Sequence, residues 1–148
     1  MKNLKKTYTT HSPEETAQIA QGIAHNLHPR DVILLKGELG AGKSTFARAL
    51  IQALCGAHKE VPSPTFTLVQ TYEIPKFVLW HFDLYRLEHP EEIYELGLEE
   101  AYATGVCLIE WPERLGSFLP RNYMEIELKY GYHEDERHIC FRGWEERH

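Results

Sequence analysis

VILLKGELGAGKS, residues 32–44, decides the fold of this chain. Its first four residues form a short apolar run between Asp31 and Gly37, which is typical of a strand that is covered on both faces in a parallel sheet. The stretch GELGAGKS matches the pattern GxxxxGK[ST], and the helical sequence STFARALIQAL follows at once. A strand, a glycine-rich turn and a helix in this order predict a loop that binds nucleotide phosphates.

The glycines of such a turn let successive backbone N–H groups point at an anion, and the helix that follows adds the partial positive charge of its N-terminus. We expect Lys43 to bridge the terminal phosphates and the hydroxyl of Ser44 to ligate Mg²⁺. The alternative is a chance match in a surface turn. Besides these two, the residues expected to surround the nucleotide are Glu38, Leu39, Gly40, Ala41, Gly42 and Thr45.

Two acidic residues end apolar strands further along the chain. FVLWHFD ends in Asp83, and VCLIE ends in Glu110. P-loop enzymes place an acid at such a strand end, where its carboxylate reaches Mg²⁺ directly or through water. Either acid can hold the metal while the other orients the attacking water. Both are therefore candidates for catalysis and for metal binding, together with Lys43 as a catalytic residue and Ser44 as a metal ligand.

The segment EVPSPTFTL, residues 60–68, contains two prolines and is interpreted as a loop. Its Thr65 lies where GTPases carry a mobile threonine that senses the terminal phosphate, and a plain loop is the alternative. For each strand-end acid, the alternative is a turn cap or an ion pair with Arg86 or Arg114.

Strand alternation places His81 on the same face as Asp83, but no third metal ligand is in sight. We therefore expect a structural histidine rather than a metal ligand. Trp80 and Trp111 are interpreted as core or pocket-wall aromatic residues.

Strands and helices are expected on both sides of this segment. Ser12, Pro13 and Glu15 form a capping box that starts a helix, and its apolar residues predict that the helix runs to about Leu27. Pro75 and Lys76 predict a tight turn between two antiparallel strands. The strands expected are 4–10, 32–35, 67–74, 77–83, 106–111, 124–130 and 137–143, with a further helix from residue 89, HPEEIYELGLEEAYA.

Helices between buried strands predict an α/β fold, a three-layer sandwich like that of P-loop NTPases. Its central sheet should be mostly parallel with added antiparallel strands, in a single domain spanning residues 1–148.

The composition excludes several classes of protein. No apolar run approaches the roughly 18 to 20 residues of a membrane-spanning helix, and the N-terminal stretch lacks the apolar core of a secretory signal, so a cytoplasmic protein without membrane contact is expected. Cys55, Cys107 and Cys140 lie far apart without a CxxC pair and are interpreted as reduced, mostly buried thiols. The net charge of −6 argues against tight non-specific binding of nucleic acid, so any link to RNA should run through a partner.

Several segments beyond the glycine-rich loop are distinctive together: SPTFTLVQTY, HFDLYRL, the PEE of 90–92, ELGLEE and LIEWPERL. With GELGAGKS they closely resemble the bacterial TsaE (formerly YjeE) family, the small P-loop ATPases of tRNA threonylcarbamoyladenosine biosynthesis. The resemblance runs in order from about Ser12 to the last expected strand. It implies a weak ATPase that uses ATP and Mg²⁺, joins the proteins TsaD and TsaB, and supports N6-threonylcarbamoyladenosine (t6A37) formation without touching tRNA directly.

The resemblance also assigns residues. Lys43 matches the phosphate-binding lysine, Ser44 the Mg²⁺ hydroxyl, Asp83 the acid of HFDLYR and Glu110 the acid of the IEW segment. Thr65 and Trp111 match the threonine of the SPT loop and the tryptophan after the glutamate, and Arg137 resembles a basic position of the family tail that can contact phosphate. Ser44 stands where threonine is commoner and Ala20 where many members carry glycine, and neither change argues against ATP binding.

Two other functions remain open. A free-standing small-molecule or nucleoside kinase would share the P-loop and an acidic strand end, although no lid or acceptor-binding segment is evident. A nucleotide-gated adaptor would use bound ATP to order the loop from Ser63 to Thr65 without needing turnover. The lack of an NKxD-like guanine motif favours ATP and ADP over guanine nucleotides.

Overall fold

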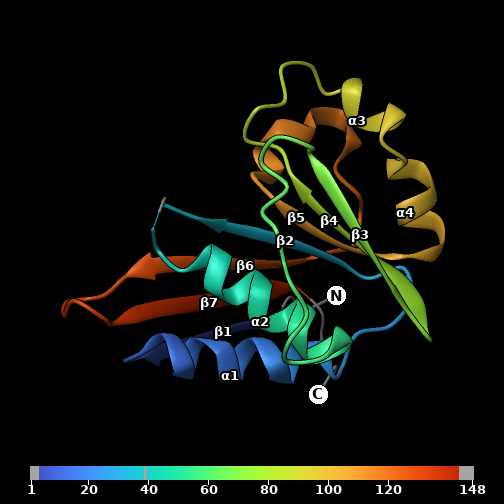
Figure 1. Ribbon diagram of the computed structural model, residues 1–148. Coiled ribbons are helices and arrows are strands. Elements are labelled where there is room, and N and C mark those ends of the chain that lie inside the picture. Colours follow the sequence, from blue (N-terminus) through green and yellow to red (C-terminus); the bar gives the residue numbers. More distant parts are fainter. Residues whose placement is uncertain (1–3, 39, 144–148) are drawn as a thin grey trace.

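A seven-stranded mixed sheet organises the computed structural model, which describes residues 4–38 and 40–143 (Figure 1). The strand order is β1-β7-β6-β2-β5-β4-β3. Strands β6, β2, β5 and β4 run parallel to one another, whereas β7, β1 and β3 pair antiparallel to their neighbours. The strands are β1 (Leu4–Thr10), β2 (Val32–Gly37), β3 (Val69–Ile74), β4 (Phe77–Asp83), β5 (Val106–Glu110), β6 (Met124–Tyr130) and β7 (Arg137–Gly143).

Helices cover both faces of the sheet, which confirms the predicted three-layer α/β fold. On one face α1 and α2 pack against each other (Figure 1). The smaller helices and a 3-10 helix, η1, cover the other face (Figure 1). Their bounds are α1 (Pro13–Ala24), α2 (Lys43–Cys55), α3 (Glu92–Glu95), α4 (Leu98–Thr104) and η1 (Pro112–Phe118).

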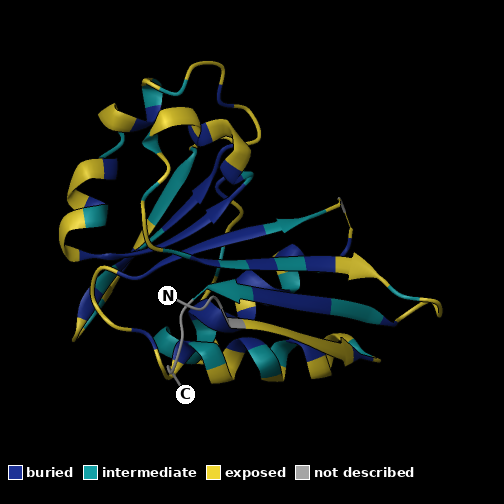
Figure 2. Cartoon of the chain, turned by 180° about the vertical axis from the view of Figure 1, so that it is seen from behind, coloured by how far each residue is buried: buried dark blue, intermediate teal, exposed yellow. Residues whose placement is uncertain are grey.

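Strand β2 shows why both faces of the sheet must be covered by helices. Its residues alternate, so that Ile33 and Leu35 enter the core under α1 and α2, while Val32 and Leu34 enter the core under α4 and η1. All four residues are buried. Figure 2 shows buried residues concentrated on the central strands and exposed residues on the outer helices. The apolar run that opened the sequence is therefore a strand of the parallel core, as predicted.

The predicted starts of two other elements are also confirmed. The backbone N–H of Glu15 donates to Ser12 Oγ at 3.1 Å, and the carboxylate of Glu15 accepts from the N–H of His11 at 2.6 Å, so the capping box forms one residue wider than its usual pattern. Pro75 and Lys76 form the turn between β3 and β4, which pair antiparallel from Ile74 and Phe77 onward.

Several predicted boundaries are wrong, among them the end of β2, which runs to Gly37 rather than Leu35. Helix α1 ends at Ala24 rather than Leu27, because the N–H groups of Asn26 and Leu27 turn to carbonyls three residues back. Strand β3 starts at Val69 rather than Thr67, since Leu68 has a positive φ of 69° and its N–H closes a turn on Pro64.

Two further errors concern the helix from residue 89 and the strand 106–111. Gly97, with φ of 98°, breaks the helix into α3 and α4, and a Cβ at this position would lie 2.8 Å from the Trp80 ring. Strand β5 ends at Glu110, because Trp111 adopts a left-handed conformation with φ of 59° and starts η1, an element that the sequence analysis did not predict.

The parallel strands place their carboxyl ends at one edge of the sheet. Glu110 at the end of β5 pairs in register with Leu35 of β2 and with Asp83 of β4. The connection from β2 to α2 leaves the sheet at this same edge, where ligands bind in open α/β sheets. Among the described residues, no helix is both long and apolar enough to cross a membrane. Cys55, Cys107 and Cys140 are free thiols, the last two buried and Cys55 half-buried.

Candidate functional site

The glycine-rich loop between β2 and α2 takes backbone conformations that favour glycine. Gly37, Gly40 and Gly42 have φ values of 149°, 81° and 110°. A Cβ on Gly37 would lie 2.7 Å from the carbonyl oxygen of Leu128 on the neighbouring strand. Gly42 is the N-cap of α2, and no side chain of a described residue caps the first N–H groups of the helix. The loop therefore presents backbone donors at a helix N-terminus, as an anion site requires.

The loop residues predicted to surround the nucleotide differ in their exposure. Ala41 is buried, Gly42 and Thr45 are half-buried, and Glu38, Gly40 and Ser44 are exposed. Leu39 lies outside the described residues. Ser44, the second residue of α2, is an exposed residue, so a ligand can approach it.

Lys43, the first residue of α2, turns its side chain into the molecule and is only 6% exposed. Its ammonium lies 3.9 Å from the centre of the Trp111 ring, a cation–π contact. Burial lowers the pKa of Lys43, and the charges of Glu110, Asp83 and Glu113 offset only part of this shift. A buried ammonium beside two carboxylates is a group that a phosphate can attract.

The two predicted acids lie side by side at the ends of β4 and β5, and both are buried. The two oxygens of Asp83 accept hydrogen bonds from Thr65 Oγ1 at 3.2 Å and from the N–H of Tyr85 at 3.1 Å. One oxygen of Glu110 lies 2.7 Å from His81 Nε2. Asp83 is thus held at both oxygens, whereas Glu110 is held at one, counting hydrogen bonds between described residues.

Of the two predicted alternatives, the turn cap is present at Asp83, whose Oδ1 accepts from the N–H of Tyr85 at the turn after β4. An ion pair of either acid with an arginine does not occur within the described part of the chain. Arg86 lies over the ring of Phe66 at 4.4 Å, and Arg114 donates to the carbonyl of Leu87 at 3.4 Å. Neither arginine therefore neutralises Asp83 or Glu110, and Lys43 is the described cation on which both acids act.

Thr65 is brought to the site by the loop that precedes β3. Its hydroxyl donates to Asp83 and lies 2.6 Å from the hydroxyl of Ser63. The neighbouring Phe66 is 80% exposed, so this loop carries its threonine inward and its aromatic ring outward. Thr65 therefore contacts a site acid, and its predicted role as a sensor of the terminal phosphate stays a prediction.

Arg137, the first residue of β7, lies near the glycine-rich loop but away from Asp83 and Glu110. Its guanidinium donates to the carbonyl oxygens of Glu134 and Glu136 at 2.8 and 2.9 Å and lies 4.8 Å from the centre of the Tyr130 ring. The Tyr130 hydroxyl in turn lies 2.7 Å from the position that a Cβ on Gly40 would occupy. Arg137 is therefore next to the loop through Tyr130, and it does not meet the carboxylates at the other end of the site.

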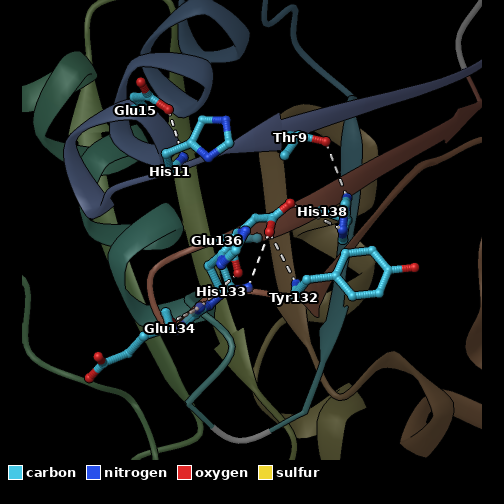
Figure 3. Close-up of polar contacts among 9 residues, drawn as sticks. Thr9, His11, Glu15, Tyr132, His133, Glu134, Glu136 and His138 are labelled. Carbon is cyan, nitrogen blue, oxygen red and sulfur yellow. Dashed lines mark hydrogen bonds and ion pairs between the residues drawn. The ribbon is translucent and has the colours of Figure 1, made fainter.

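The turn that carries Arg137 is shaped by Glu136, a buried acid that the sequence analysis did not single out. Figure 3 shows its carboxylate pointing at the backbone of Tyr132 and His133, whose N–H groups donate to it at 3.1 and 3.2 Å. These bonds hold the pKa of Glu136 below its ordinary value despite the opposing effect of desolvation. A link from Thr9 to His138 at 3.2 Å joins the same region to β1 (Figure 3).

Sequence reasoning also missed the aromatic contacts of the site. Tyr85 packs against Trp111 with ring centres 5.0 Å apart, and the Trp111 ring makes the cation–π contact with the Lys43 ammonium. Trp111 is half-buried and walls the site, as predicted. A signal for Tyr85 and Trp111 exists in hindsight, since each lies one or two residues after a strand-end acid. Nothing in the sequence distinguishes Tyr130 from the other exposed tyrosines.

Comparisons with known proteins agree on one family. The family model described as "Threonylcarbamoyl adenosine biosynthesis protein TsaE" matches residues 10–139. The tRNA threonylcarbamoyladenosine biosynthesis protein TsaE of Rickettsia bellii (strain RML369-C) is 44% identical over 140 residues, which cover 95% of this chain and 96% of that protein. The protein of the same name from Bacillus subtilis (strain 168) is 42% identical over 142 residues, covering 95% of this chain and 86% of that protein.

A solved structure gives the same result. The crystal structure of Bacillus subtilis YdiB superposes with a TM-score of 0.79 at 33% sequence identity, covering 99% of this chain and 90% of that chain. The similarity therefore extends over the sheet and both helical layers.

Proposed function

The chain belongs to the TsaE family of threonylcarbamoyl adenosine biosynthesis proteins, and from that premise we propose that it binds ATP with Mg²⁺ in the glycine-rich loop and hydrolyses it to ADP and phosphate. One observation carries the proposal. Three buried charged groups, Lys43, Asp83 and Glu110, come from three different elements and meet beside a loop whose backbone suits an anion. Because uncompensated charges are costly to bury, their convergence points to a charged ligand.

The donor set fits a hard cation. Ser44, an exposed residue, offers a hydroxyl, and Glu110 offers the carboxylate oxygen that accepts no hydrogen bond from a described residue. Oxygen ligands of this kind are those that Mg²⁺ prefers, usually one or two carboxylates with substrate phosphates. We assign Mg²⁺ to Ser44 and Glu110, with Asp83 as a further acid near it. When bound, the ion would neutralise charge on the terminal phosphates.

We assign a separate role to each protein group of the site. The N–H groups from Gly40 to Ser44 would bind the phosphates, and Lys43 would leave the Trp111 ring to meet the terminal ones. Asp83, held by Thr65 and by the N–H of Tyr85, is the better candidate for orienting the attacking water, since its position is fixed at both oxygens. Arg137 would add a positive charge at the loop's other side.

At the level of the cell, we propose that this ATPase acts with the TsaD and TsaB proteins in forming t6A on tRNA, and that it touches tRNA only through them. The family membership supports the pathway, and the acidic net charge of −6 favours docking on proteins over binding tRNA phosphates. The test is ATP hydrolysis by the purified protein, alone and with TsaD–TsaB. Lys43→Ala is the blank, and stimulation by the pair is the expected result. A chain that neither binds the pair nor hydrolyses ATP would end the proposal.

A second function, a nucleotide-gated adaptor, is favoured by the contact between Thr65 and Asp83. A loop fixed to a site acid can change its position when a nucleotide competes for that acid. Glu110→Ala separates the two functions: if this variant still binds ATP and still supports t6A formation in cells, hydrolysis is dispensable. Loss of t6A in Glu110→Ala, with ATP binding retained, favours the ATPase.

A further inference from the structure

His81 is the buried group that the proposed reaction leaves unexplained. It lies on β4 two residues before Asp83 and is only 2% exposed. Its Nε2 is 2.7 Å from Glu110 Oε2, while its other ring nitrogen, Nδ1, is buried without a hydrogen-bond partner among the described residues. Sequence reasoning expected a structural histidine here, and the structure gives it one specific contact, with a site acid.

The two ring nitrogens together determine where the proton lies. An ionised carboxylate only accepts hydrogen bonds, so we assign the proton of this contact to Nε2, which then donates to Glu110. An N–H at Nδ1 would then be a buried donor without an acceptor, which costs more than a bare lone pair. The arrangement therefore favours one tautomer, with the proton on Nε2 and none on Nδ1.

This bond fixes a carboxylate that is otherwise free to turn. The last torsion of a glutamate side chain is broad and roughly two-fold, so a carboxylate without partners samples many orientations. A hydrogen bond to a charged acceptor is about twice as strong as one between neutral groups. With Oε2 held by His81, the other oxygen of Glu110 accepts no hydrogen bond from a described residue, and the charge of this carboxylate acts on Lys43.

We propose that His81 is a positioning residue, whose Nε2–H orients the Glu110 carboxylate so that its other oxygen can take a divalent cation. The inference rests on the proposed function, because it assigns the cation to Glu110. It goes beyond that function, since it makes a histidine that never touches nucleotide a determinant of metal affinity. Partners that orient metal ligands in this way typically change metal affinity or activity by about 10- to 100-fold when removed.

Two substitutions of His81 distinguish a role in orienting Glu110 from a role in packing alone. His81→Leu fills similar space without a donor, and His81→Gln places an amide N–H near the position of Nε2. The first measurement is Mn²⁺ affinity in the presence of ADP, from the free Mn²⁺ signal in electron paramagnetic resonance. We expect His81→Leu to weaken Mn²⁺ binding by about 10- to 100-fold and His81→Gln to recover most of it. In steady-state hydrolysis, kcat should fall in His81→Leu while the KM for ATP stays near that of the wild type.

Melting curves of both variants serve as the control for folding. A folded His81→Leu variant with wild-type Mn²⁺ affinity would overturn the proposal, as would a folded His81→Gln variant that recovers nothing.

A second measurement needs neither variant and no nucleotide. Long-range ¹H–¹⁵N spectra of the wild-type protein should show His81 with the proton on Nε2 alone, and Glu110→Ala should disturb this single tautomer. A proton on Nδ1 in the wild type, or an unchanged His81 spectrum in Glu110→Ala, would overturn the proposal. If the wild type binds no Mn²⁺ with ADP, the proposed function fails, and these spectra still decide whether His81 orients Glu110.

Discussion

The charged form of Lys43 is destabilised by its burial in the folded protein without nucleotide. Burial lowers its pKa from the ordinary value of 10.5, and the nearby acids only partly restore it, so the ammonium is less stable in the folded chain than in the unfolded one. The unfolded chain binds more protons between the lowered pKa and 10.5. The resulting destabilisation is therefore fully present below the lowered pKa and disappears as the pH rises toward 10.5.

From this we predict that Lys43→Met, without nucleotide at neutral pH, melts no lower than the wild type. The variant should also lose the stabilisation by Mg²⁺-ATP, which at 100 times Kd is about 2.7 kcal/mol, or roughly 5 to 10 °C. Differential scanning fluorimetry measures both. Lys59→Met, at an exposed lysine, is the matched control and should keep the nucleotide shift. A retained shift in Lys43→Met would remove this lysine from the site.

Gly37 and Gly22 make a second comparison of single residues. A Cβ on Gly37 would meet a backbone carbonyl oxygen at 2.7 Å in a left-handed conformation, whereas a Cβ on Gly22, inside α1, meets nothing within 4 Å. We predict that Gly37→Ala lowers the free energy of unfolding by about 1 to 3 kcal/mol. Gly22→Ala should raise it by about 0.5 to 1 kcal/mol. Urea unfolding measures both, and equal effects of the two substitutions would contradict the prediction.

The hairpin of β6 and β7 is attached to the parallel core by charges as well as by backbone pairing. Glu125 on β6 lies 3.0 Å from Lys36 of β2 and 2.8 Å from Arg142 of β7. Burial raises the pKa of Glu125, but hydrogen bonds from the two cations more than offset this, so the net shift is downward from 4.5. The pairing therefore stabilises the fold above pH 4.5, and this contribution is lost as the pH falls through the lowered pKa.

We predict that Glu125→Gln lowers the free energy of unfolding at pH 7 by less than about 1 kcal/mol, because both cations are partly exposed. The difference from the wild type should shrink as the pH drops well below 4.5. Denaturant unfolding over a pH series tests this. Glu127→Gln, whose ionic contacts are 3.8 and 3.9 Å, should have a smaller effect at every pH.

The elements that the sequence predicted well are those whose signal is local. The apolar run of β2, the capping box of α1 and the turn at Pro75 each depend on neighbouring residues, and each is confirmed. Two of the wrong boundaries have tertiary causes. The Trp80 ring leaves no room for a Cβ at Gly97, and the left-handed turn at Trp111 places its ring under Lys43.

The candidate site divides in the same way. Lys43, Asp83 and Glu110 follow from motif spacing and from the rule that parallel strands end at one edge, and the structure brings them together. The contact of His81 with Glu110 depends on the register of β4 against β5, which no short sequence pattern reveals.

Across the whole molecule, the acidic balance bears on the proposal that this chain reaches tRNA only through partners. Affinity for nucleic acid comes mainly from Lys and Arg side chains, which replace the counterions of the phosphates. In a chain of net charge −6, acidic residues outnumber these cations. We predict that the purified chain shows no saturable binding to tRNA below about 10 µM at physiological salt, since even basic proteins bind non-specifically with Kd of about 1 to 100 µM. Added TsaD–TsaB should bring it into a complex with tRNA.

Electrophoretic mobility shift with labelled tRNA measures this, with TsaD–TsaB alone as the control for what the partners bind by themselves. A further shift of the TsaD–TsaB–tRNA band on adding this chain supports indirect contact. Sub-micromolar binding by the chain alone, weakening steeply between low and physiological salt, would show a cationic surface that the net charge conceals and would place the protein directly on its RNA.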